Sequence, residues 1–282
     1  MTGAGRYAPS PTGELHLGNL RTALLAWLGA RSRDAGFLVR IEDLDSGRSR
    51  EHFVKTQLDE IRALGLDWDG EPVKQSERGQ LYGAAIAKLE QKGLTYECFC
   101  TRAEIREASS ASHGDVPGDF YPGTCAHLTA AEIEDKRRSG RPPALRVRAG
   151  APDDFVVRRN DGDYAYHLAV VVDDADQEID EVVRGADLLD STPRQLWLFE
   201  QLGLQAPERY IHVPLMLGED GARLAKRHGS VSLEQRMAEG TTAEELVGEL
   251  ATSVGLAEPG QAMQPAELLP HFDWSLVKPP VV

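Results

Sequence analysis

The chain has 282 residues, of which 41% are hydrophobic and 27% charged, as is typical of a globular protein with a substantial core. Its net charge of −14, from 31 basic and 45 acidic residues, argues against a protein that coats nucleic acid, because that role needs a positive surface. The chain shows no apolar run long enough to cross a bilayer and no apolar signal segment, so we expect a cytoplasmic protein.

The N-terminal third alternates between short buried strands and helical patterns. Strands are predicted at 6–9 ("RYAP") and 37–45 ("FLVRIEDLD"), and helices at 20–30, 51–64 and 80–93, with Gly93 ending the last. Strand–helix–strand order implies parallel pairing with right-handed crossovers. This part of the chain therefore predicts one half of an α/β domain.

The alternation of strand and helix patterns stops at about residue 98, where a turn-rich segment and then a basic stretch interrupt it. The α/β signal returns with an apolar run, "YHLAVVVDDAD", that is typical of a buried parallel strand. The elements predicted after it are a helix at 191–203 with Thr192 as N-cap, a strand at 209–217, a loop at 218–230, and a helix at 232–240 with Ser232 and Gln235 as a capping box.

These elements predict a doubly wound parallel sheet of the α/β class that is split by an insertion. The expected divisions are a first half of the α/β domain at 1–97, an insertion at 98–160, a second half at 161–240 and a short C-terminal extension at 241–282.

The first loop lies between a strand that ends near Ala8 and a helix that begins near Gly18. The start of such a helix exposes backbone N–H groups that favour an anion. Gly18 allows close approach to the backbone, and His16 and Asn19 supply hydrogen-bond donors. The loop is therefore interpreted as a nucleotide-phosphate site.

The stretch "PSPTGELHLGN", residues 9–19, resembles the signature of class I aminoacyl-tRNA synthetases of the glutamyl and glutaminyl branch. Their second signature is a lysine loop after the last sheet strand, where this chain has "RLAKR" at 223–227, with Ala225 where the family often has serine. The resemblance implies a Rossmann-like domain that uses ATP with Mg²⁺ as a substrate. It assigns ATP binding to His16, Gly18, Asn19 and Lys226, and catalysis to all of these except Gly18.

The resemblance also implies L-glutamate as the amino acid. Arginine neutralises a carboxylate with two parallel hydrogen bonds, which suits Arg6 and Arg184. Ser10 is expected to donate a hydrogen bond, Glu42 to hold the substrate ammonium, and Tyr166 to pack nearby. Without the resemblance, Arg6 and Glu42 could equally form a structural ion pair, and Tyr166 could be a core aromatic.

The chain has only three cysteines, all within 28 positions: Cys98, Cys100 and Cys125. An odd number of clustered thiols in a chain without an export signal points to a metal rather than to disulfides. The family pattern C-x-C…Y-x-x-x-C implies one structural zinc ion with Tyr121 as the fourth ligand. His113 and His127 are chemically more usual donors and remain alternatives for that position.

The segment that follows the lysine loop is short and acidic, whereas a full glutamyl-tRNA synthetase carries C-terminal domains that read the anticodon. The chain therefore resembles the stand-alone glutamyl-queuosine tRNA(Asp) synthetases. These activate glutamate without tRNA and attach it to queuosine in the anticodon of tRNA(Asp). Residues 136–159, with eight basic and two acidic side chains, are the expected contact with the anticodon stem-loop. No membrane partner is expected, and the chain is expected to act as a monomer.

Three other interpretations stay open. The chain could be a truncated glutamyl-tRNA synthetase that charges a tRNA 3′ end, or a non-catalytic paralogue that only binds RNA or an enzyme. The presence of both His16 and Lys226 argues against the second. A general nucleotidyltransferase that shares the first loop is disfavoured by the two pocket arginines.

Overall fold

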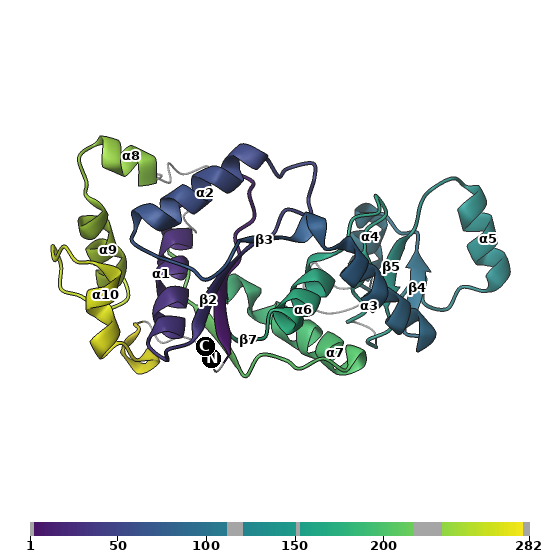
Figure 1. Ribbon diagram of the computed structural model, residues 1–282. Coiled ribbons are helices and arrows are strands. Elements are labelled where there is room, and N and C mark those ends of the chain that lie inside the picture. The colour runs from purple at the N-terminus through teal and green to yellow at the C-terminus, as the bar shows by residue number, and fades with distance from the viewer. Residues whose placement is uncertain (1–2, 112–120, 151–152, 217–232, 279–282) are drawn as a thin grey trace. The chain divides into compact units, whose positions relative to one another are not determined.

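The computed structural model describes residues 3–111, 121–150, 153–216 and 233–278. The chain divides into two compact units (Figure 1), the first made of 1–77, 174–192 and 207–282 and the second of 78–173 and 193–206. The boundaries expected near 98 and 160 both lie within the second unit.

The first unit is built on a five-stranded sheet with the order β3-β2-β1-β7-β8, in which all neighbours are parallel. The strands are β1 (Ala4–Tyr7), β2 (Gly36–Ile41), β3 (Val73–Lys74), β7 (Ile179–Gly185) and β8 (Arg209–Val213). The order reverses between β1 and β7, and ligands of open α/β sheets bind beyond the carboxyl ends of the strands at such a point. The predicted parallel α/β fold is confirmed.

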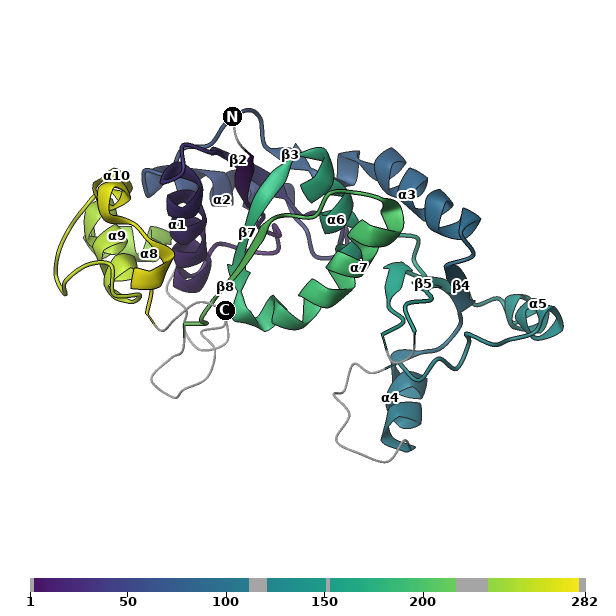
Figure 2. The ribbon, with the colours of Figure 1, turned by 90° about the horizontal axis from the view of Figure 1, so that it is seen from below.

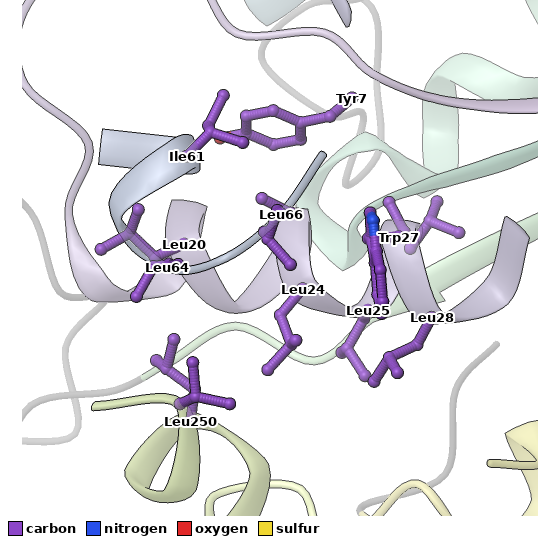
Figure 3. Packing of buried hydrophobic residues seen from close by; sticks show 14 of the residues in the cluster. Tyr7, Leu20, Leu24, Leu25, Trp27, Leu28, Ile61, Leu64, Leu66 and Leu250 are labelled. Atoms are coloured by element: carbon purple, nitrogen blue, oxygen red, sulfur yellow. The ribbon is translucent and has the colours of Figure 1, made fainter. Parts of the chain in front are cut away.

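One face of this sheet is covered by α1 (Leu17–Arg31) and α2 (Glu51–Ala63), and α9 (Ala243–Thr252) packs against α1 (Figure 1). Helix α1 is apolar on nearly all sides and is buried from Ala23 to Ala30, as a helix covered by neighbours should be. Figure 3 shows leucines of α1 between residues that follow α2 and Leu250 of α9. This cluster is the main core of the unit.

The C-terminal segment belongs to the first unit and shares its core. Buried residues of α9 and the turn after it, including Leu246, Leu250 and Val254, join the cluster around α1. The short helices α8 (Leu233–Ala238) and α10 (Pro265–Leu268) flank α9 in the chain. The helix predicted at 232–240 is confirmed as α8, whereas the Ser232 end of its capping box lies outside the described residues.

The second unit contains an antiparallel sheet of order β4-β5-β6 together with several helices (Figure 2). Its elements are α3 (Gly79–Gln91), β4 (Thr95–Cys98), α4 (Arg102–Ala111), α5 (Ala130–Arg138), β5 (Ala144–Val147), β6 (Val156–Arg158) and α7 (Thr192–Leu202). The region expected as an insertion at 98–160 therefore contains helices and strands of its own, whereas most of its turn-rich segment at 109–125 lies outside the described residues.

Two local predictions are wrong. The run "YHLAVVVDDAD" forms helix α6 (Tyr166–Asp176), not a strand. Its centre, Leu168 to Val172, is buried throughout, so burial removed the periodicity that separates a helix from a strand. Thr192 is the first residue of α7 rather than its N-cap, because a 3₁₀ turn at Ala186–Ser191 runs directly into that helix.

None of the helices within the described ranges has both the length and the apolar character needed to cross a membrane.

Candidate active site and metal centre

The loop between β1 and α1 is held by two buried polar side chains of α2. The Gln57 amide nitrogen donates to the carbonyl oxygens of Ser10, at 3.0 Å, and Gly13, at 2.6 Å. The Glu60 carboxylate accepts the backbone N–H of Leu15 at 3.0 Å. Because these bonds satisfy loop backbone groups from within the core, the loop is fixed before any ligand arrives.

His16 and Asn19 begin α1 with a capping box. Asn19 N–H donates to His16 Nδ1 at 3.3 Å, and His16 N–H donates to Asn19 Oδ1 at 3.3 Å. A neutral imidazole whose Nδ1 accepts carries its proton on Nε2. The geometry therefore fixes the tautomer of the ring that the first signature contributes.

Gly18 has a reason to be glycine within the chain itself. A Cβ added there would lie 3.1 Å from Cε1 and 3.2 Å from Nδ1 of His16. These distances are tighter than most contacts of a real Cβ, so an alanine would push the ring away from the helix start. The structure thus adds a steric role to the close backbone approach expected from the sequence.

Three of the residues predicted to bind the substrate glutamate lie on, or directly after, neighbouring strands of the sheet. Arg6 of β1 stands opposite Leu38 of β2 and Val182 of β7. Since side chains two residues apart share a face of a strand, Arg40 and Arg184 lie on the same face as Arg6. Glu42 follows β2 by one residue and continues this series.

The opposite face of the sheet carries the apolar side chains at the alternating positions of these strands and of β8. They belong to the main core: Tyr7, Phe37, Val39, Ile41, Val183 and Val213. The sheet therefore divides its side chains into an apolar face and a face with charged residues at the carboxyl ends of β1, β2 and β7.

The ion pairs on the charged face do not include the structural Arg6–Glu42 pair that the sequence left open. Arg6 Nε donates to Asp174 Oδ1 at 3.1 Å, rather than pairing with Glu42. Glu42 instead accepts from Arg40 Nη2 at 3.3 Å. Asp174 comes from α6, so partners 168 residues apart meet here.

Burial raises the pKa of Glu42 above its ordinary value, against the opposing effect of Arg40 and Arg6. Burial acts on Asp174 in the same direction, but Arg6 and Arg40 outweigh it and hold the pKa of that carboxyl below its ordinary range. At neutral pH the cluster therefore contains an ionised aspartate between two arginines.

Arg184 is buried among polar groups that hold its guanidinium. Its Nε donates to His212 Nε2 at 3.1 Å, and its Nη2 donates to the Thr192 hydroxyl at 2.8 Å. The guanidinium carbon lies 5.4 Å from the ring centroid of Tyr210. These contacts orient the side chain at the end of β7.

The remaining predicted residues are placed as follows. Ser10 is exposed in the first loop, and Tyr166 is the half-buried first residue of α6, with its ring centroid 5.4 Å from that of His167. Lys226 and Ala225 lie outside the described residues. The part of the ATP site expected from the lysine loop is therefore not described.

The three cysteine sulfurs gather within 4.8 Å of one another. Cys100 Sγ lies 3.5 Å from Cys125 Sγ, and the Tyr121 hydroxyl lies 3.3 Å from Cys98 Sγ and 3.9 Å from Cys100 Sγ. Ligands of tetrahedral zinc, with Zn–S about 2.3 Å and Zn–O about 2.0 Å, are separated by roughly 3.5–3.8 Å. The four side chains therefore fit a zinc ion.

Among the donors considered for the fourth position, Tyr121 is the one the structure brings to the sulfurs. Its oxygen also accepts the backbone N–H of Cys125 at 2.9 Å, and the Arg146 guanidinium lies 3.7 Å above its ring. His127 is exposed and is not part of the thiol group, and His113 lies outside the described residues.

Residues 4–257 match the family model of class I tRNA synthetases (E and Q), catalytic domain. The chain belongs to this family. A relative from Nocardia farcinica called glutamyl-Q tRNA(Asp) synthetase is 53% identical, over 96% of this chain and 89% of its own. Glutamate--tRNA ligase 1 of Halorhodospira halophila is 40% identical, over 97% and 63%. The solved glutamate tRNA ligase of Elizabethkingia meningosepticum, in complex with its amino acid, has a TM-score of 0.81 at 25% identity, over 98% of this chain and 66% of that one.

The family predicted from the two signatures is thus confirmed. Sequence reasoning missed the buried polar residues that hold the loop and the charged face: Arg40, Gln57, Glu60, Asp174 and His212. A signal for one of them exists, because Arg40, like Arg6, interrupts an otherwise apolar strand at an alternate position. A charged residue inside a buried strand needs a partner, and that need could have marked them.

Proposed function

We propose that this chain activates L-glutamate with ATP, without tRNA, and transfers the glutamyl group to queuosine in the anticodon of tRNA(Asp). It would then be an ATP-dependent ligase of the aminoacyl-tRNA synthetase type. One comparison carries this choice within the family: identity reaches 53% with a glutamyl-Q tRNA(Asp) synthetase, but 40% and 42% with two glutamate--tRNA ligases.

The charged face of the sheet supports glutamate as the substrate. Arg6 and Arg184 offer guanidinium groups for carboxylates, and Glu42 offers a carboxylate for the ammonium. Their strands are adjacent at the point where the sheet order reverses. Ser10 and Tyr166 are the two further residues proposed to bind glutamate.

The proposed chemistry is electrostatic. The amino-acid carboxylate of glutamate, not its side-chain carboxylate, attacks the α-phosphate of ATP, which carries Mg²⁺. Pyrophosphate leaves as charge builds on the phosphate oxygens. His16, with its proton on Nε2, and the N-terminus of α1 at Gly18 and Asn19 stabilise that charge from one side. Lys226 acts from the other side.

We also propose one structural zinc ion held by Cys98, Cys100, Tyr121 and Cys125. When bound, zinc supplies a crosslink to a segment with a small core of its own. Two exposed basic side chains at the end of α5, Lys136 and Arg138, support a contact with the phosphate backbone of the RNA. Arg146 belongs to the basic stretch but is buried against Tyr121 and is excluded from that role.

The deciding experiment measures transfer of radiolabelled glutamate to three RNAs: tRNA(Asp) with queuosine, tRNA(Asp) without it, and tRNA(Glu). We expect label only on the first, in a base-labile bond. Label on the 3′ end of tRNA(Glu) would instead identify a glutamyl-tRNA synthetase.

A second measurement separates an enzyme from a non-catalytic RNA-binding paralogue. Glutamate-dependent pyrophosphate exchange is expected without any tRNA, and Lys226→Ala should lower its rate more than about tenfold while folding is intact. No exchange in the unchanged protein would favour the binding role.

A further inference from the structure

We infer that Asp174 and Arg40 are positioning residues for the glutamate site: Asp174 fixes Arg6 and Arg40, and Arg40 fixes the carboxylate of Glu42. This inference rests on the proposed function, because it takes Arg6 and Glu42 as groups that bind glutamate.

The first link is a single carboxylate oxygen shared by two arginines. Asp174 Oδ1 accepts from Arg40 Nη1 at 2.7 Å and from Arg6 Nε at 3.1 Å. The side chains of Asp174, Arg6 and Arg40 are 1%, 4% and 0% exposed, so water screens these pairs little. Removing the aspartate would leave two buried cations without the acceptor they share.

The second link runs from Arg40 to the substrate side of the site. Arg40 Nη2 donates to Glu42 Oε1 at 3.3 Å, while its Nη1 also donates to Gln177 Oε1 at 2.9 Å. Glu42 is 11% exposed, more than Asp174, Arg6 or Arg40. The network therefore passes from a buried aspartate to the carboxylate that is proposed to hold the ammonium.

Charge balance explains why the network matters for ligand binding. Arg6 and Arg40 are opposed by Asp174 and Glu42, which gives two positive and two negative groups. Without the Asp174 charge, Glu42 would be the carboxylate of these ion pairs that still opposes the two arginines. A carboxylate drawn inward to two buried arginines is a poorer acceptor for the substrate ammonium.

The chain provides a matched control in the next residue. Asp173 is as buried as Asp174, lies on the same helix, and pairs with Arg78 Nε at 2.6 Å and with the Tyr82 hydroxyl at 2.9 Å. Neither of these partners belongs to the proposed pocket. Asp173→Asn should therefore disturb a buried ion pair without changing glutamate recognition.

The experiment compares Asp174→Asn with Asp173→Asn by steady-state pyrophosphate exchange and by thermal unfolding. For Asp174→Asn we expect the KM for glutamate to rise about tenfold or more, with the KM for ATP within about twofold. For Asp173→Asn we expect a lower unfolding temperature and both KM values within about twofold. An unchanged glutamate KM in Asp174→Asn, or an equal rise in both variants, would overturn the inference.

Arg40→Lys provides a second test if either aspartate variant fails to fold. Lysine keeps the charge but lacks the planar fork that reaches Asp174 and Glu42 together. We expect weaker glutamate binding but an unchanged inhibition constant for glutarate, which has both carboxylates and no ammonium. Equal weakening of the two ligands, or of neither, would count against the inference.

Glu42→Gln distinguishes a failure of the positioning inference from a failure of the proposed glutamate site. If Glu42→Gln leaves the glutamate KM unchanged, the proposed pocket itself is wrong. If it raises the KM while Arg40→Lys and Asp174→Asn do not, only the positioning role is wrong.

Discussion

His16 Nδ1 accepts the backbone N–H of Asn19 at 3.3 Å, so the ring proposed to contact ATP also caps α1. One side chain therefore joins the loop after β1 to the helix that forms the centre of the core. Capping uses Nδ1 and the proposed catalytic role uses Nε2, which allows substitutions to separate the two.

The first prediction uses this separation. His16→Asn should leave stability within about 1 kcal/mol, because asparagine is a good N-cap residue. Its pyrophosphate-exchange rate should fall about 100-fold, since the Nε2 donor is lost. His16→Ala should lose both functions. Equal exchange rates in His16→Asn and the unchanged protein would show that the ring only caps the helix.

The second prediction concerns the glycine beneath the ring. Gly18→Ala should displace His16 and lower the exchange rate by about tenfold, with little loss of stability. Gly79→Ala is the control, since Gly79 also begins a helix but a Cβ there meets its nearest neighbour, a Tyr164 carbon, at an ordinary 3.5 Å. The control should keep the full rate, and a similar fall in both variants would point to helix starts in general.

The third prediction concerns pH. Burial raises the pKa of Glu42 above 4.5, and only the ionised form attracts the substrate ammonium. The KM for glutamate should therefore rise as the pH falls through that raised pKa, in a range where the protein is still folded by thermal unfolding. Glu42→Gln should have a high KM that is flat across the same range. A pH-dependence that survives in Glu42→Gln would assign the titration to another group.

The fourth prediction tests the metal centre. Purified protein should contain about one zinc per chain. Tyr121→Phe should weaken zinc retention against a chromophoric chelator more than about tenfold, whereas His127→Ala should not. Tyr96→Phe is the matched control, because its hydroxyl donates to Asp154 rather than facing the sulfurs. Loss of zinc in His127→Ala instead would transfer the fourth position to the histidine.

The fifth prediction concerns the C-terminal segment. Leu250→Ala should destabilise the protein by about 2–5 kcal/mol, because Leu250 is fully buried in the cluster around α1 (Figure 3). Leu276→Ala, at a leucine that is 45% exposed, should change the unfolding free energy by less than about 0.5 kcal/mol. Equal effects in chemical denaturation would show that α9 adds little to the core.

Much of the fold and part of the site could be predicted because their signals are local. The first loop, the start of α1 near Gly18 and the C-x-C pair each occupy a few consecutive residues, and their chemistry depends on neighbours in the chain. Strand–helix alternation likewise implied a parallel sheet, because a parallel crossover needs a long connection.

The partners of the charged residues needed the tertiary structure. Asp174 meets Arg6 across 168 positions and Arg40 across 134, and no local pattern encodes which acid reaches which arginine.

The apolar run of α6 allowed either a helix or a strand, since burial on all sides removes periodicity. Likewise, the ring of Tyr121 reaches the sulfurs and that of His127 does not, because backbone direction decides which side chain enters a site. Local sequence patterns were enough to predict the family, the parallel sheet and the residue types of the site. Only long-range packing decided which of those residues touch, because ion pairs and metal ligands depend on distances between segments that lie far apart in the chain.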